Sequence, residues 1–284
     1  MANCFSWRDE MGFSPLEILG LVHGVKPISR MSVNPKEASF GTRFKKFREK
    51  CERLGLQWQL EYFENFAGAW PDTTMLYVCK RMKTIEELIE AEKARDVKKI
   101  GRIFGFPECC IEFFFGKAEN RSNIAFEVLK NSKKPLSFYN NFVLYTASDF
   151  KPKNALECNC LKEARNKSFY FIYHIPCSFN CNKSIEMGKK YKRVLEKEAP
   201  LLAEQAKNAL KKTMVYFGSF NFVLLNDAIE GKSENEAFYE SVFEFPTTTS
   251  KKILEKIRQG NRIKAENGAL AVFKNRQKIL ELKK

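Results

Sequence analysis

The sequence predicts an α+β protein, with helices and short strands mixed around one central core and a basic helix and hairpin at the C-terminal end. Some segments carry apolar residues three or four positions apart, which is typical of helices. Other segments alternate apolar and polar residues or are rich in β-branched residues, which is typical of strands. The chain has 284 residues, 44% of them hydrophobic, which is enough apolar material for a core without disulfides. We divide it into an N-terminal α+β segment at 1–83, a core domain at 84–249 and a basic C-terminal extension at 250–284.

The N-terminal segment should contain two helices and then two strands. A short helix is expected at 15–21 and a basic helix at 40–54. The second helix is predicted by four residues that share one helical face: Phe44, Phe47, Cys51 and Leu54. Gly55 then follows as a candidate C-cap. Strands are predicted at 56–63, where apolar and polar residues alternate, and at 74–79.

The core domain should open with a helix at 84–99, because residues 84–87 (TIEE) have the form of a capping box. A second helix is expected to start at Pro107, a residue suited to a first turn, and to end at Gly116. A third helix is predicted at 124–130.

Further along, residues 168–173 form a continuous aromatic and β-branched run, which predicts a buried strand. A long helix should follow at 184–213, with a break or kink at Pro200. The predicted strand would deliver His174 and the residues after it to the start of this helix.

The remaining elements are two strands, a helix and a hairpin. The strands are expected at 214–225 and 237–245, and a basic helix capped by Ser250 should extend to about Gln259. Asn267-Gly268 between two apolar runs is a strong signal for a hairpin.

No stretch of the chain approaches the roughly 20 apolar residues that span a bilayer, and the first ten residues lack the pattern of a secretory signal. We therefore expect a cytoplasmic protein without a membrane partner, in which thiols stay reduced. The nine cysteines are then better explained as metal ligands, catalytic thiols or core residues than as disulfides.

Two motifs place cysteines beside a proline at the start of a helix: residues 105–110 (GFPECC) and 174–181 (HIPCSFNC). A helix N-terminus offers free N–H groups and a positive dipole end, which favour a thiolate over a thiol. We expect five residues of these motifs to form one site: Cys109, Cys110, His174, Cys177 and Cys181. Because 63 residues separate Cys110 from His174, only the fold can bring the two motifs together.

The identity of the cofactor stays open between an iron–sulfur cluster, zinc and no metal. The cluster is slightly favoured, because adjacent cysteines chelate one zinc poorly yet can reach different irons, and no Cys-x2-Cys spacing typical of zinc is present. Without a metal, two thiols of low pKa would act as nucleophile and resolving thiol, with His174 as the general base.

The other cysteines and the second histidine carry weaker expectations. Cys158 and Cys160 would supply an outer ligand or nothing. Three further cysteines are expected to be core or incidental residues: Cys4, Cys51 and Cys79. His23 is interpreted as a turn residue rather than as a distant partner of the site.

The net charge of +15 is concentrated in two segments. Residues 251–284 carry eleven Lys or Arg and three Glu, and residues 182–213 carry nine Lys or Arg and four Glu. Such charge suits RNA or an anionic small molecule, although a solvated lysine-rich surface explains it equally well and no nucleic-acid motif accompanies it.

The paired motifs, together with the Phe-rich segment after Cys110 and Ser184 after Cys181, resemble an uncharacterised family found mainly in archaea and catalogued as a domain of unknown function. The resemblance covers roughly residues 84–212. It implies that the Cys and His residues of the two motifs matter, but it implies no reaction.

We therefore expect a metal-binding protein, iron–sulfur or zinc, that acts as an enzyme of unspecified reaction through its Cys/His centre. The alternative is an RNA- or other polyanion-binding protein in which the metal is structural. A third hypothesis is an interaction protein whose cysteines belong to the core.

Overall fold

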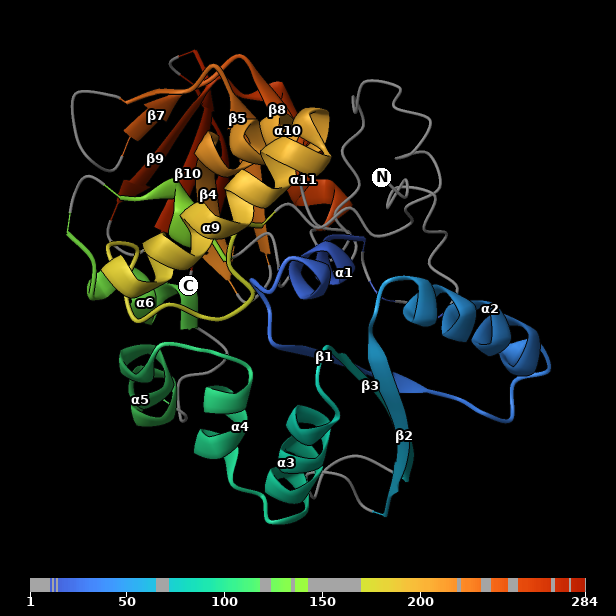
Figure 1. Cartoon of the computed structure of the whole chain (residues 1–284). Helices are drawn as coiled ribbons and strands as arrows, with labels where there is room; N and C mark the ends of the chain where they lie inside the picture. The colour runs from blue at the N-terminus through green and yellow to red at the C-terminus, as the bar shows by residue number, and fades with distance from the viewer. Residues whose placement is uncertain are drawn as a thin grey trace.

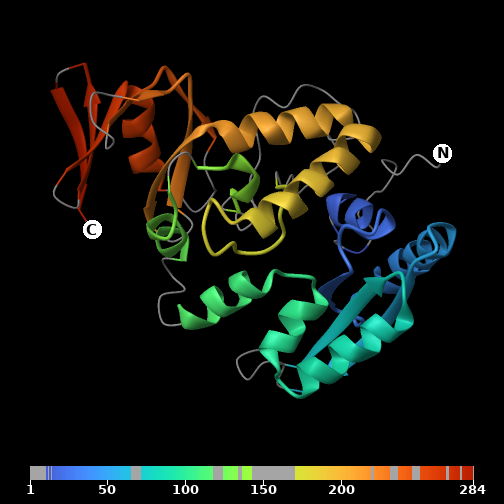
Figure 2. The ribbon, with the colours of Figure 1, turned by 60° about the vertical axis from the view of Figure 1, so that its left-hand side comes forward.

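The structure is a computed structural model, and it describes residues 11, 13, 15–64, 72–117, 124–133, 136–142, 170–218, 221–230, 236–244, 250–266, 269–275 and 277–283. Helices alternate with short antiparallel strands along the chain, so the predicted α+β class is confirmed. One small sheet with its helices lies at one end of the molecule, and the C-terminal sheets lie at the other end, with further helices between them (Figures 1 and 2).

The N-terminal sheet has the strand order β1-β3-β2, formed by β1 (Ile28–Val33), β3 (Thr73–Cys79) and β2 (Gln57–Phe63). Helices α1 (Pro15–Val22) and α2 (Phe40–Arg53) precede β2, as predicted, and Gly55 adopts the positive φ of +63° typical of a helix C-cap glycine. The strands at 56–63 and 74–79 are confirmed, whereas β1 was not predicted.

Successive side chains of β3 point to opposite faces of this sheet, as a strand requires. Leu76 and Val78 pack with α1 and α2, while Tyr77 and Cys79 pack with α3 (Met82–Lys93) and residues near α4 (Val97–Ile103). Both faces of the sheet are therefore covered by helices, with separate apolar clusters on the two sides.

The single helix predicted at 84–99 is wrong, because the chain breaks between α3 and α4. Arg95 has a φ of +54°, and the Asp96 side chain accepts a hydrogen bond of 2.9 Å from the Lys99 backbone N–H, which caps α4. The predicted capping box is also wrong: Arg81 is the N-cap of α3, and Thr84 lies within the first turn.

The middle of the molecule is helical. It contains α5 (Glu108–Gly116), α6 (Ile124–Lys130), a short 3-10 turn η4 (Phe138–Asn140), α9 (Asn182–Glu198) and α10 (Pro200–Lys211). The helices expected after Pro107 and at 124–130 are confirmed, as is the break at Pro200. Residues 170–173 form no strand, although all four are buried; residues 168–169 lie outside the described residues.

Those four residues hold the central core together. Their side chains pack with α1 and with α9 and α10, in the largest of the apolar clusters. Phe171 and Ile172 are fully buried, so the aromatic run serves as core while its backbone stays irregular. Because residues 170–173 are not part of a sheet, the chain can turn directly after them into the second cysteine motif.

The C-terminal part contains two more antiparallel sheets. Strands β4 (Thr213–Gly218), β5 (Asn221–Asn226) and β8 (Ser241–Glu244) form one in the order β4-β5-β8. The other has the order β11-β10-β9-β7-β6, from β11 (Gln277–Lys283), β10 (Ala269–Lys274), β9 (Arg262–Glu266), β7 (Glu236–Phe238) and β6 (Ile229–Glu230). The single strands predicted at 214–225 and 237–245 are each two strands. The hairpin is confirmed as β9–β10, although residues 267–268 at its tip lie outside the described residues.

The basic helix is confirmed as α11 (Lys251–Gln259), with Ser250 as its N-cap residue. Strand β5 lies between two cores: Phe222 and Leu224 belong to the central cluster, whereas Val223 and Leu225 pack with α11 and β9. Because β9 also pairs with β7, the segments 84–249 and 250–284 share a sheet and a core. The division of the chain into three domains stays a prediction.

Candidate metal centre

Four cysteine sulfurs from the two motifs meet at one point. Cys109, Cys110, Cys177 and Cys181 place their Sγ atoms within 4.8 Å of one another. The Cys181 sulfur lies 3.7 Å from those of Cys109 and Cys110, which are 3.9 Å apart. The fold therefore closes the gap between the motifs, and the four cysteines can hold a metal ion.

The first pair of sulfurs is positioned by the entry into α5. Gly105 has a φ of +77°, a conformation that suits glycine, and Pro107 is the N-cap residue of the helix. Cys109 and Cys110 then fall in the first turn, where adjacent side chains diverge by about 100°. Cys110 is buried and Cys109 is exposed, yet both reach the same point because it lies at the helix end rather than along one face.

The second pair is held in a turn that other parts of the chain clamp. The fully buried Asn140 donates from Nδ2 to the carbonyls of Ser178, Phe179 and Cys181, at 3.3, 3.2 and 3.1 Å. Asn131 donates to the Cys177 carbonyl at 3.1 Å. These contacts fix the backbone that carries Cys177 and Cys181.

Ser132 adds a further clamp by accepting a hydrogen bond of 2.7 Å from the Phe179 N–H. Sequence reasoning missed this serine and both asparagines, since no motif or spacing connects them with the cysteines. Only the packing of η4 and of the end of α6 against the turn reveals them.

The two halves of the site are also joined directly. The Cys177 N–H donates to the Cys110 sulfur at 3.3 Å, although the residues are 67 positions apart. Cys181 is the N-cap residue of α9, so its sulfur lies at the positive end of a 17-residue helix. Two helix N-termini and a backbone N–H therefore surround the sulfurs, which favours negative charge there.

The structure places His174 beside the four sulfurs but not among them. Its Nε2 shares a hydrogen bond of 2.7 Å with the Ser184 hydroxyl, which lies 3.4 Å from the Cys110 sulfur. Phe106 stacks on the imidazole, with ring centroids 5.4 Å apart. His174 thus supports the cysteines through Ser184, and the expectation that it ligates the same ion is not met by this geometry.

Burial decides the charge of His174. It lowers the pKa of the imidazole to about 4, and the nearby Cys181 thiolate opposes this shift only in part. His174 is therefore neutral at pH 7. Its Nδ1 is buried and has no hydrogen-bond partner in the described part of the chain.

Without a metal, the shared contacts lower the pKa of Cys181 and raise the pKa values of Cys110 and Cys177. The Cys110 thiol donates toward Cys181, and with the polar groups of Ser184 it lowers the pKa of Cys181 to about 4. The same contact raises the pKa of Cys110 well above its usual range, with burial as the second cause. Burial also raises the pKa of Cys177 to about 12, and the Cys181 thiolate adds to that shift. A bound cation would favour the thiolate form of each ligand.

Of the remaining sequence-predicted residues, those that the structure describes lie away from this centre. Cys51 and Cys79 are buried in the N-terminal clusters, in agreement with a core role. His23 is in the turn after α1 and pairs with Glu198 at 3.4 Å. Cys4, Cys158 and Cys160 lie outside the described residues.

A search of the described helices finds none that is both long and apolar enough to cross a membrane. No family model matches the chain, and no curated protein or solved structure is significantly similar to it. The resemblance to an archaeal family stays a prediction. A function is therefore argued from the centre formed by the four cysteines.

Proposed function

We propose that the chain is a metal-binding protein whose four cysteines hold one tetrahedral zinc ion. The observation that carries the proposal is the set of sulfur separations. An ion with four bonds of about 2.3 Å to sulfur, arranged as a tetrahedron, separates each pair of sulfurs by about 3.8 Å. The separations of 3.7, 3.7 and 3.9 Å around Cys109, Cys110 and Cys181 match that edge length.

The same separations favour a single ion over an iron–sulfur cluster, which the sequence slightly favoured. A cluster distributes its cysteines over several irons, so sulfurs on different irons lie farther apart than sulfurs on one ion. All four sulfurs lie within 4.8 Å of one another, which leaves little room for such a core. The 3.9 Å between Cys109 and Cys110 also answers the objection that adjacent cysteines chelate one ion poorly.

Four protein ligands fill a tetrahedral ion, which is the pattern of structural zinc rather than of catalytic zinc with an open position. The ion would join the start of α5, the turn at 177–181 and the start of α9. These parts also pack against the central apolar cluster, and the binding energy of the ion would add to the free energy of folding. His174 and Ser184 would orient Cys110, as outer partners of metal ligands do.

Metal analysis of protein purified with and without air tests the proposal. One zinc per chain, and the d–d absorption of a tetrahedral tetrathiolate after Co²⁺ replaces it, are the expected results. A brown protein with acid-labile sulfide would instead support the iron–sulfur alternative. Protein without any metal, which also fails to take up Zn²⁺ or Co²⁺, would refute both.

A further inference from the structure

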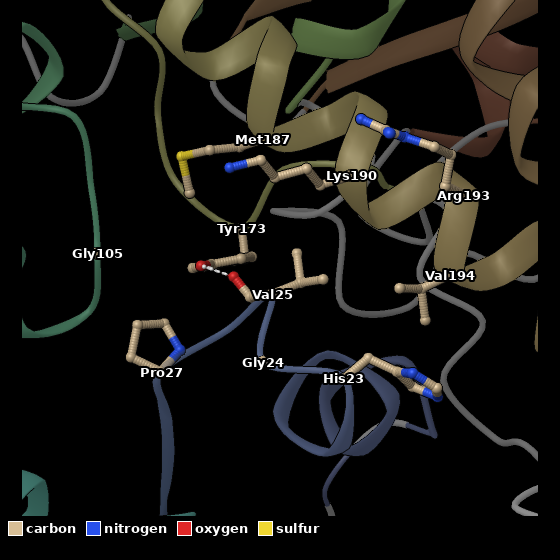
Figure 3. Close-up of a pocket in the computed structure, with 10 residues that line it drawn as sticks. All are labelled: His23, Gly24, Val25, Pro27, Gly105, Tyr173, Met187, Lys190, Arg193 and Val194. Carbon is tan, nitrogen blue, oxygen red and sulfur yellow. Dashed lines mark hydrogen bonds between the residues drawn. The ribbon is translucent and has the colours of Figure 1, made fainter.

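A second candidate site includes Tyr173, the neighbour of His174 in the chain. A pocket of about 440 Å³ opens between α9 and the turn that joins α1 to β1, with Gly105 on a third side (Figure 3). We propose that this pocket binds a small phosphorylated organic molecule of sugar-phosphate size, with Lys190 and Arg193 as the groups that recognise the phosphate.

The charge of the pocket comes from one face of α9. Lys190 and Arg193 are three positions apart, so they lie one above the other on the helix. Neither forms an ion pair with any residue that the structure describes. The neighbouring lysines outside the pocket are neutralised instead, Lys189 by Glu186 and Lys192 by Glu196. The two cations that line the pocket thus form no direct ion pair with a described residue, although both attract the Glu186 carboxylate at longer range.

Figure 3 shows how these side chains lie. Lys190 extends from α9 over Tyr173, and Arg193 runs along the helix. The Arg193 Nε donates to the Lys189 carbonyl at 3.4 Å, which leaves the terminal nitrogens of the guanidinium available to a ligand. On the opposite side His23 is held by Glu198, whose carboxylate repels an anion there. The phosphate is therefore expected at the Lys190 end.

Two positive charges suit a phosphate monoester better than a carboxylate. The second pKa of such a phosphate is about 6, so it carries close to two negative charges at pH 7. Arginine pairs with two phosphate oxygens at once, and lysine adds a point charge.

The rest of the pocket is built for an organic body. Val25, Pro27, Met187 and Val194 supply apolar walls, and the Tyr173 hydroxyl is already committed to the Val25 carbonyl at 3.0 Å (Figure 3). The volume of about 440 Å³ falls at the lower end of the range of about 300–1,000 Å³ typical of small-ligand pockets, which suits a ligand as small as a sugar phosphate.

The experiment compares two double variants of the full chain that remove the same charge from the same helix. Ribose 5-phosphate, glycerol 3-phosphate and adenosine 5′-monophosphate are titrated in the millimolar range, with ribose and inorganic phosphate as partial ligands. Calorimetry and the ¹³C-methyl signal of Met187, which lines the pocket, report binding. We expect at least one phosphate monoester to bind saturably, more tightly than inorganic phosphate, and ribose not to bind.

The K190A/R193A variant should weaken this binding at least about tenfold, since it removes charge-assisted hydrogen bonds. The matched K189A/K192A variant should change it by less than about twofold. Unchanged metal content in both variants shows that the cysteine centre and the fold are intact. Absence of saturable binding by all three monoesters would overturn the proposal. An equal loss of monoester affinity in the two variants would also overturn it. A third refuting outcome is single-stranded RNA that binds more tightly than any monoester and loses affinity equally in the two variants. Diffuse surface charge would then explain the binding.

Discussion

Replacement of Asn140 by leucine removes the clamp on the second cysteine pair while keeping the number and branching of the side-chain heavy atoms. The amide has two protons, which three carbonyl oxygens share at 3.1, 3.2 and 3.3 Å. Two hydrogen bonds at about 1 kcal/mol each give an expected loss of about 2 kcal/mol in the free energy of unfolding. The Ser178 and Cys181 carbonyls keep backbone partners, the N–H groups of Cys181 and Ile185, so no further penalty is added for them. Because the clamp orients the backbone of two ligands, zinc affinity should fall about 10- to 100-fold.

The adjacent Asn141 provides a matched control. It is also buried, its Oδ1 also lacks a partner among the described residues, and its Nδ2 donates to one carbonyl, that of Leu210, at 3.3 Å. Asn141→Leu should therefore cost about 1 kcal/mol and leave zinc affinity unchanged. Urea unfolding followed by circular dichroism measures stability, and competition with a zinc-binding dye measures affinity. If the two variants lose equal stability and Asn140→Leu binds zinc like the wild type, the assigned role of Asn140 is wrong.

Three further perturbations test the site and its surroundings. Cys181→Ser should abolish stoichiometric zinc binding, whereas Cys51→Ala, which removes a buried cysteine outside the site, should keep one zinc per chain by metal analysis. Gly105→Ala should lower the free energy of unfolding by about 1–2 kcal/mol, because φ is +77° and a Cβ atom would lie 3.0 Å from Pro27 Cγ; an unchanged melting temperature would contradict this. His174 should make the metal-free protein less stable in acid. The pKa of its imidazole is about 4 in the folded protein and 6.5 in the unfolded chain, so the unfolded chain takes up the proton first as pH falls. The free energy of unfolding should therefore decrease between about pH 6.5 and pH 4, by up to about 3 kcal/mol. Urea unfolding across that range should show a weaker pH dependence for His174→Gln, and equal slopes would refute the assignment.

Local patterns predicted most helices and several strands, because their signals lie within the elements themselves. The spacing on α2, the glycine after it and the proline that begins α10 are examples. The errors occur where tertiary contacts overrule a local preference. Residues 170–173 have strong strand propensity, yet no neighbouring strand pairs with them in the described chain, and the demand for burial is met without a sheet. The break at Asp96 could have been found, since aspartate is a common N-cap.

The four cysteines of the centre were predictable as a group, but their geometry was not. Cysteines at two helix entrances indicated Cys109, Cys110, Cys177 and Cys181 as one group. His174 was assigned to the same group because it is close in sequence, but a distance of three residues along a turn does not determine where an imidazole points. The role of Asn140 could not be predicted, because hydrogen bonds from one side chain to a turn far away in the sequence produce no pattern in the sequence.

The position of β5 between two cores limits how this chain can change in length. Phe222 and Leu224 serve one apolar cluster, and Val223 and Leu225 serve the other. Inserting or deleting a single residue within the strand would exchange the two faces, so that every side chain would meet the wrong core. Because both faces are apolar, such a shift would not expose a charge to either core; it would instead mismatch side-chain volumes on both sides at once. Length variation is therefore expected in the connections around β5 and not within it.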